Sequence, residues 1–331
     1  MKKLYTLSLF IISLATFAQA VDPFLGTGAL NANGWITHSG ATPGQMVIVP
    51  GSLSYPGLTT SGNKTQIIAA NTEDVNLASS APITGVAYYS AIINVLNTDG
   101  LSANADTGNY FLTFGATAGA SVTGFNGRVY IKAGVTTGTV SLGVLNGSGG
   151  TATPTYVVTD LPVNTSTFVV MKFDIASNTA SLFINPLVGV SEIAPTVTNA
   201  TGTTAAPTQI ATVAIRQGAT TAPPGNTGNV EIDEVRLGST WEFVTSANLA
   251  TNQNSISGLK VYPNPVTNGV LYITSENNNL KVVNIYDVLG KLVLKTVLND
   301  QSVNVSNLKG GVYIVKITED GKTATRKLVI R

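Results

Sequence analysis

The acidic side chains best spaced for catalysis lie in one short segment, Glu231-Ile232-Asp233-Glu234. Alternate residues of a strand point to the same side, so an extended segment would place Glu231 and Asp233 on one face with Val235 and Leu237. Glu234 and Arg236 would face the opposite way. A glycosidase needs two carboxylates in one cleft, and this pattern leaves Asp233 without a second carboxylate two residues further on.

The same segment is similar to the motif Glu-x-Asp-x-x-Glu or Glu-x-Asp-x-Glu of jelly-roll β-glucanases, in which nucleophile, helper and acid point into one cleft. Val235 stands where the acid is required. This departure predicts that the protein does not hydrolyse glycosides and that Asp233 is a hydrogen-bonded structural carboxylate.

The sequence has one histidine, His38, and no cysteine. A histidine base needs a partner group, and no G-x-S-x-G segment supplies a nucleophile, so we expect His38 to be an ordinary loop residue. Trp35, Tyr88, Tyr110 and Trp241 are expected to serve in core or rim packing. The sequence therefore predicts no catalytic residue and no enzyme.

Metal binding is limited by the same composition. One histidine without cysteine cannot supply a usual zinc site. Calcium needs only oxygen ligands, which cluster at Asn97, Asp99, Asn104 and Asp106. Their spacing fits no EF-hand, and such residues commonly form turns. We expect no cofactor, with calcium at this loop as the alternative.

A glycan site needs an aromatic ring among polar groups on a sheet face. Alternation groups Arg128, Tyr130 and Lys132 on one side of a strand. Lys172 and Asp174 share a face of another strand in the same way. We expect these two strands to form one polar groove, joined by Arg216 and Arg236. A solvated sheet face is the alternative.

Strands must position these groups, because only 11% of the residues are charged and the chain contains 33 glycines. The sequence predicts an all-β protein with a large antiparallel sandwich over residues 21–247. Its expected strands are Met46–Val49, Gln66–Ala69, Gly85–Val95, Tyr110–Phe114, Arg128–Lys132, Thr139–Leu145, Thr155–Val158, Thr167–Ile175, Ser181–Ile184, Ile210–Arg216 and Val230–Leu237.

Charge divides the chain into two parts. Residues 21–247 carry 6 Lys or Arg against 12 Asp or Glu, a net charge of −6. Residues 258–331 carry 10 Lys or Arg against 5 Asp or Glu, a net charge of +5. Neither part has a dense basic patch with interleaved aromatic residues, so nucleic acid is not an expected partner. Residues 248–257 are polar and read as a linker.

The first residues have the pattern of a signal peptide. Lys2 and Lys3 precede an apolar stretch from Leu4 to Phe17, and Ala18-Gln19-Ala20 fits signal peptidase cleavage before Val21. We therefore expect residues 1–20 to direct the chain to the general secretory translocon and then to be removed. No apolar run after them is long enough to span a membrane.

Seven short β-branched runs follow residue 258, which predicts a small immunoglobulin-like sandwich: Leu259–Tyr262, Val270–Thr274, Lys281–Tyr286, Leu292–Leu298, Ser302–Val305, Val312–Ile317 and Thr325–Ile330. Between and within them lie turn and strand residues in a characteristic order: Tyr262, Pro263, Asn264, Pro265, Tyr286, Asp287, Gly290, Lys291, Gly311, Tyr313, Lys316 and Lys327. With these residues the segment resembles the type A C-terminal sorting domain of the type IX secretion system of Bacteroidota. The resemblance implies passage through the periplasm, recognition by the outer-membrane translocon, removal by a sortase, and a final place outside the cell or on its surface.

The larger part also resembles a known fold, more loosely. Gly51 to Leu58, Val86 to Ser90, Leu182 to Pro186, and Ile232 to Gly238 with Trp241 are similar to concanavalin A-like, laminin G-like jelly rolls. The resemblance implies a domain for binding or adhesion, with a glycan or a surface protein as ligand. A polysaccharide-degrading glycosidase or lyase of the same fold and a purely structural surface protein are the alternatives.

Overall fold

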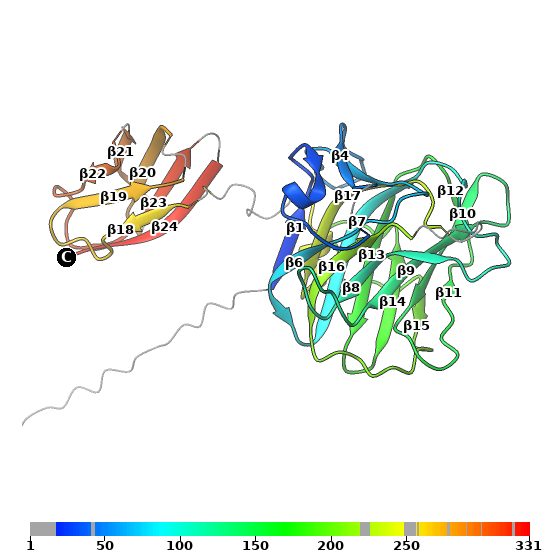
Figure 1. Ribbon diagram of the computed structural model, residues 1–331. Helices are drawn as coiled ribbons and strands as arrows, with labels where there is room; N and C mark the ends of the chain where they lie inside the picture. Colours follow the sequence, from blue (N-terminus) through cyan, green and yellow to red (C-terminus); the bar gives the residue numbers. More distant parts are fainter. Residues whose placement is uncertain are drawn as a thin grey trace, which may run out of the picture. The chain divides into compact units, whose positions relative to one another are not determined.

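The computed structural model describes residues 18–40, 44–218, 226–247, 256, 258–276, 279–288, 290–298, 300–319 and 322–331. The chain divides into two compact units, Met1–Asn248 and Leu249–Arg331 (Figure 1). The predicted leader up to residue 17, and the predicted linker apart from residue 256, lie outside the described residues. None of the helices in the described ranges is long and apolar enough to cross a membrane.

The first unit is a sandwich of two antiparallel sheets, which confirms the predicted all-β jelly roll. Sheet A has the order β15-β14-β13-β7-β17-β5-β4-β2, with β1 also paired to β17. Its strands are β1 Gln19–Asp22, β2 Gly28–Ala29, β4 Val47–Val49, β5 Lys64–Ile67, β7 Val86–Val95, β13 Thr167–Asp174, β14 Thr179–Ile184, β15 Val197–Asn199 and β17 Val230–Gly238. β1 includes Gln19 and Ala20, which the sequence assigned to the leader.

Sheet B has the order β11-β10-β9-β8-β16-β6-β3, with β12 also paired to β10. Its strands are β3 Ile36–Ser39, β6 Asp74–Ile83, β8 Asn109–Gly115, β9 Asn126–Ala133, β10 Thr139–Leu145, β11 Thr155–Tyr156, β12 Leu161–Pro162 and β16 Ile210–Arg216. The described part of the first unit also contains two short helices, η1 Leu30–Ala32 and α1 Trp241–Thr245.

The core lies between the two sheets. Side chains from both inner faces meet there with no exposed surface, among them Phe111 and Phe114 of sheet B and Met171 and Phe173 of sheet A. Val129 and Ile131 of β9 point into this core, as alternation predicted. Arg128, Tyr130 and Lys132 are therefore left on the outer face of sheet B.

One prediction about the sheets is wrong. β9 and β13 belong to different sheets, so the outer faces that carry Tyr130 and Lys172 point in opposite directions. A single groove cannot contain both strands. Alternation correctly assigned the residues of each strand to a face, but it carries no information about which strands become neighbours.

A second prediction fails in β17. Ile232, Val235 and Leu237 are all buried in the core, and a register shift lies between Asp233 and Arg236. Glu234 has a φ of 51°, in the left-handed region, so a β-bulge interrupts the alternation there. Asp233 consequently does not share a face with Val235 and Leu237.

The second unit is a smaller sandwich with the seven predicted strands. One sheet has the order β18-β19-β22 and the other the order β21-β20-β23-β24. The strands are β18 Lys260–Tyr262, β19 Val270–Thr274, β20 Lys281–Tyr286, β21 Leu292–Leu298, β22 Ser302–Asn304, β23 Gly311–Glu319 and β24 Lys322–Ile330. Val283, Ile285, Val315, Ile317 and Leu328 are fully buried between the sheets.

Candidate functional site

The outer face of sheet A is covered by a second apolar layer. Trp241 and Val244 of α1 pack with Leu53 against Phe168 and Phe183 of the sheet. The Asp233 carboxylate fixes this covering, because it accepts hydrogen bonds from Ser52 Oγ at 2.6 Å and from the Leu53 amide at 2.7 Å. Asp233 is thus a hydrogen-bonded structural residue, as predicted, and the outer face of sheet B is the better candidate for a ligand.

A row of aromatic side chains crosses the outer face of sheet B. The strand register places Tyr110 of β8 opposite Tyr130 of β9, Tyr130 opposite Gly143 of β10, and Gly143 opposite Tyr156 of β11. The ring centroids of Tyr110 and Tyr130 are 5.7 Å apart. Gly143 has no side chain, and a Cβ there would lie 2.9 Å from the Tyr156 ring. The missing side chain thus gives the Tyr156 ring room over β10.

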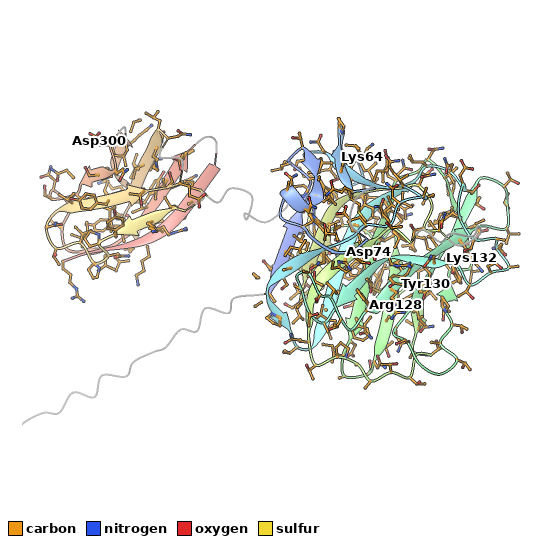
Figure 2. The ribbon with its side chains drawn as sticks, in the orientation of Figure 1. Lys64, Asp74, Arg128, Tyr130, Lys132 and Asp300 are labelled. Carbon is orange, nitrogen blue, oxygen red and sulfur yellow. The ribbon has the colours of Figure 1, made fainter. Side chains whose placement is uncertain are left out.

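Basic side chains lie along the same row. The Arg128 and Arg216 guanidinium carbons are 5.1 and 4.5 Å from the centroid of the Tyr110 ring. Lys132 Nζ is 4.2 Å from the centroid of the Tyr156 ring. Figure 2 labels Arg128, Tyr130 and Lys132 on the strands of sheet B, with Lys64 of sheet A apart from them. The row therefore combines flat apolar rings with positive charge.

These cations differ from those of sheet A in their partners. Lys64 pairs with Glu231 at 2.8 Å, Lys172 with Glu192 at 2.7 Å, and Arg236 with Glu234 at 3.5 Å. Within the described residues, no carboxylate lies within 4.0 Å of the charged groups of Arg128, Lys132 or Arg216. Three of the six cations of residues 21–247 therefore meet on one face without an ion pair.

Hydrogen bonds hold these three cations in place. Arg128 Nε and Nη2 donate to the Phe125 carbonyl at 3.1 and 3.0 Å. Arg216 Nη1 donates to Asn109 Oδ1 at 2.6 Å, and Lys132 Nζ donates to the Asn104 carbonyl at 2.6 Å. All these acceptors are neutral, so the hydrogen bonds orient the three charges. Asp74 lies opposite Arg216 in the register of β16 and β6, so Arg216 has a carboxylate nearby, although none of the described residues places one within 4.0 Å.

A pocket of about 260 Å³ lies at the β3 end of the row. Its lining residues come from four strands and from the loop between β8 and β9: His38, Ser39, Asp74, Tyr110, Thr113, Val122, Phe125, Ala214 and Arg216. The loop is fastened to β6 by Asn76, whose Nδ2 donates to the Gly119 carbonyl at 2.9 Å and whose Oδ1 accepts from the Gly119 amide at 3.0 Å. Phe125 and Arg128 also line a neighbouring pocket of about 540 Å³.

The ionisable groups of the first pocket are perturbed. Burial raises the pKa of Asp74 to about 6, while the nearby Arg216 guanidinium and a hydrogen bond from the Gln217 amide act in the opposite direction. Burial lowers the pKa of His38, whose Nδ1 lies 3.3 Å from Asn76 Nδ2. Burial raises the pKa of Tyr110, against the effect of Arg216 and Arg128. Perturbed groups gathered in a cleft are typical of functional sites.

The predicted glycan residues divide between the two sheets. Arg128, Tyr130 and Lys132 lie together on the row. Lys172 and Asp174 lie on sheet A, where Lys172 pairs with Glu192 and Asp174 Oδ1 accepts from the Ala176 amide at 2.9 Å. Arg236 is 1% exposed and donates to the Ser246 carbonyl. The groove expected from β9 and β13 is therefore replaced by a surface on sheet B alone.

Sequence reasoning missed three important members of this surface. His38 lies in a strand rather than in a loop, and it lines the pocket. Tyr110, which was expected in core or rim packing, lies between two arginines. Asp74 begins β6, a strand that the sequence did not predict. Trp35 and Trp241 are buried, as expected. The sequence did contain a signal for Tyr110. Neighbouring residues of a strand face opposite sides, so Tyr110 lies on the outer face because Phe111 is buried in the core.

The oxygen-rich loop proposed for calcium forms turns. Asn97 Oδ1 accepts from the Asp99 amide at 3.1 Å, and Asp106 Oδ2 accepts from the Ala103 amide at 3.2 Å. Asn104 Nδ2 donates to the Ala133 carbonyl. No group of three His, Cys, Asp or Glu suited to a metal occurs in the parts of the chain that the structure describes.

In the second unit, the sorting-motif residues tie the ends of the sandwich together. Asn264 Nδ2 donates to the Lys327 carbonyl at 2.8 Å, and Asn264 Oδ1 accepts from the Val329 amide at 2.9 Å. Lys291 donates its amide to Asp287 Oδ1 in the turn that contains Gly290. Tyr313 donates to the Lys309 carbonyl. Lys316 and Lys327 lie on neighbouring strands, Gly311 begins β23, and Tyr286 ends β20.

Comparison with known proteins finds enzymes among the relatives. The chain is 29% identical over 111 residues to an endo-acting ulvan lyase of Formosa agariphila, covering 32% of this chain and 21% of the relative. It is 38% identical over 73 residues to beta-agarase D of Zobellia galactanivorans, and this match covers 22% of this chain and 15% of the relative. The chain thus spans about a fifth or less of these relatives. Their names contradict the expectation that the protein is not an enzyme.

Among solved structures, peanut lectin is similar, with a TM-score of 0.39, 9% identity, and coverage of 68% of this chain and 98% of the lectin. Residues 260–331 match the family described as secretion system C-terminal sorting domain. This match confirms the predicted type IX sorting tail and its consequence, export to the cell surface or the extracellular space. The last 72 residues of the chain, 260–331, are thus a member of the secretion system C-terminal sorting domain family.

Proposed function

We propose that the first unit is a polysaccharide-degrading enzyme whose substrate lies across the outer face of sheet B. The observation that carries the proposal is the row formed by Tyr110, Tyr130 and Tyr156, which leads to the pocket that contains His38 and Asp74. Tyr130 is only 9% exposed, so a ligand would contact mainly the half-buried Tyr110 and Tyr156 and the cations that lie over their rings. Aromatic rings offer apolar contact surface, and a few convergent polar groups fix the orientation of a ligand. A row that crosses four strands suits a polymer better than a single sugar.

The pocket also contains groups that can move protons. His38 and Tyr110 line the same space, and an imidazole and a phenol are both general acid–base groups. Nδ1 of His38 faces Asn76, which leaves Nε2 for a substrate. Glycan binding at the row would thus bring a sugar linkage beside two proton-transfer groups.

Two further observations agree with this function. The relatives named ulvan lyase and agarase are polysaccharide-degrading enzymes by name. Export by the sorting tail places the protein outside the cell, where polymers too large for uptake are found. We propose that signal peptidase and the general secretory translocon handle the chain first, and that the type IX translocon and sortase handle it afterwards.

A polysaccharide panel tests the proposal. The full chain should release new reducing ends from at least one of a polyuronate, a sulfated galactan, a neutral galactan and a β-glucan. His38→Gln should remove this release, whereas Tyr88→Phe on sheet A should leave it unchanged. A wild-type protein that releases no ends from any of the four polymers would contradict the function.

A further inference from the structure

We infer that the substrate is a polyuronate and that the enzyme cleaves it by β-elimination. This inference rests on the proposed function, because it assigns a substrate class and a reaction to the same surface. Three observations support it: the unpaired cations, the single carboxylate of the pocket, and the position of Tyr110 between two guanidinium groups.

The cations indicate an acidic polymer. Residues 21–247 carry a net charge of −6, and yet three of their six cations gather on the tyrosine row. Every cation of sheet A has a carboxylate within 4.0 Å, whereas Arg128, Lys132 and Arg216 have none among the described residues. Arg128 and Arg216 are the two that line pockets. Guanidinium groups bind carboxylates through paired hydrogen bonds, so these two arginines suit successive acidic sugars.

The carboxylates argue against hydrolysis. Glycosidases use two carboxyl groups, about 5 to 9.5 Å apart. Asp74 is the only acidic residue in the described lining of the two pockets. Glu231 pairs with Lys64 on sheet A, and Asp233 and Glu234 are fully buried beneath its covering layer. β-Elimination needs no second carboxylate, because it requires only one base, one acid and a cation for the carboxylate of the sugar.

The reaction can be written with the residues of the pocket. Arg216 binds the uronate carboxylate and so stabilises the negative charge that develops when the proton on C5 is removed. Asn76 Nδ2 donates its two hydrogens to the Ile36 and Gly119 carbonyls, so the His38 hydrogen can lie on Nδ1. In this tautomer Nε2 of His38 takes the proton, the electron pair forms the C4=C5 double bond, and the C4–O bond breaks. The phenol of Tyr110 donates a proton to the departing oxygen. The products are one new reducing end and one unsaturated uronate, and no water or cofactor is consumed.

The environments of the two groups agree with these roles. Burial lowers the pKa of His38, which keeps the imidazole neutral and able to accept a proton at neutral pH. Burial raises the pKa of Tyr110, which keeps the phenol protonated. Asp74 and Arg216 are the other ionisable groups that line this pocket. Environments that move two pKa values in opposite directions are a common basis for acid and base roles.

The decisive experiment measures two products from the same reaction. The full chain is incubated with polygalacturonate, with alginate and with a neutral galactan, and both reducing ends and the ultraviolet absorbance of the unsaturated uronate are followed. We expect the two signals to rise together on a polyuronate and neither to rise on the neutral galactan. Reducing ends without unsaturation, or cleavage of the neutral polymer alone, would overturn the inference and leave the proposed function standing. No cleavage of these three polymers would overturn the inference, and the proposed function would fall with it only if the sulfated galactan and the β-glucan were not cleaved either.

Variants then test the residues. Arg216→Gln and Arg128→Gln should each lower kcat/KM on the polyuronate about tenfold or more, since each removes a charged hydrogen-bond donor. The matched control Lys172→Gln, on sheet A, should change kcat/KM less than about twofold. Thermal unfolding of each variant shows whether it has folded. If both folded arginine variants retain wild-type kcat/KM, the assignment of the cations is wrong.

Discussion

The guanidinium carbon of Arg216 lies 4.5 Å from the centroid of the Tyr110 ring, and Arg216 Nη1 also donates to the Tyr110 carbonyl at 3.2 Å. β16 and β8 are neighbouring strands, so the sheet itself sets this relationship. Arg128 approaches the same ring from β9, on the other side of β8. Tyr110 is therefore the residue at which the charge and the aromatic row of sheet B coincide.

This position makes Tyr110→Phe an informative change. The phenylalanine keeps the ring between the two arginines and loses only the hydroxyl group. If the phenol donates a proton, kcat should fall about 100-fold or more, while KM changes little. Steady-state kinetics on a cleaved polysaccharide measures both values. Tyr130→Phe, on the neighbouring strand, is the matched control, and an equal loss of kcat in both variants would argue against a special role for Tyr110.

Individual strands of this protein could be predicted well from the sequence. β10 and β16 have the predicted bounds, and the outward placement of Arg128, Tyr130 and Lys132 followed from alternation with Val129 and Ile131. In the second unit, all seven strands were predicted, because each is a compact β-branched run between turn residues.

The candidate site could not be assembled in the same way. It depends on β6, whose second half, Ala-Ser-Ser-Ala-Pro, has little strand propensity, and on the non-local pairing of β16 with both β6 and β8. His38 and Arg216 are far apart in the sequence, and only this pairing brings them to one pocket. The bulge at Glu234 is likewise invisible to alternation, since a glutamate with positive φ gives no local signal.

The buried carboxylate of Asp233 predicts a dependence of stability on pH. Burial raises the pKa of Asp233 to about 7, and the hydrogen bonds from Ser52, Leu53 and Glu234 only partly oppose this effect. An ordinary Asp pKa is about 3.9, so between these values the folded protein binds a proton that the unfolded chain does not. The free energy of unfolding of the first unit should therefore increase as the pH falls from 8 toward 5, by at most about 1.4 kcal/mol per pH unit for this group.

Denaturant unfolding at several pH values, followed by tryptophan fluorescence, measures this dependence. Both tryptophans, Trp35 and Trp241, lie in the first unit. Asp233→Asn should reduce the slope, and it should also cost about 1–3 kcal/mol, because the new amide group faces the Leu53 N–H and Ser52 hydroxyl. If the free energy of unfolding instead rises with pH over the same range, the predicted direction of the pH dependence is wrong.

The hydrogen bonds of Asn264 predict that part of the sorting motif stabilises the fold of the second unit. Its side-chain amide bonds both the Lys327 carbonyl and the Val329 amide, and so joins the turn after β18 to the last strand. Asn264→Ala removes both bonds and should destabilise the second unit by about 1–3 kcal/mol. Limited proteolysis of the full chain, with cleavage followed inside residues 258–331, measures this loss. Asn268→Ala is the matched control, since Asn268 accepts only one exposed bond from the Val270 amide. Equal protease resistance of the two variants would contradict the role.

The last prediction concerns a buried ion pair in the same unit. Lys281 Nζ lies 3.0 Å from Glu319 Oε1, and the two side chains are only 4% and 5% exposed. Glu319 Oε1 also accepts from Ser275 Oγ at 2.7 Å and from the Asn279 amide at 2.8 Å. Removing one partner leaves a buried charge without its counterpart, so Lys281→Met or Glu319→Leu alone should cost about 3–5 kcal/mol.

The double variant Lys281→Met, Glu319→Leu should recover part of that loss, because it removes both buried charges and leaves apolar volume in their place. It still leaves the Ser275 hydroxyl and the Asn279 amide without this acceptor, so recovery should be incomplete. Protease resistance of the second unit in the full chain, compared among the wild type, both single variants and the double variant, gives the coupling energy. Strictly additive losses would show that the two side chains do not depend on each other, and that the close contact contributes nothing to the stability of the sorting domain.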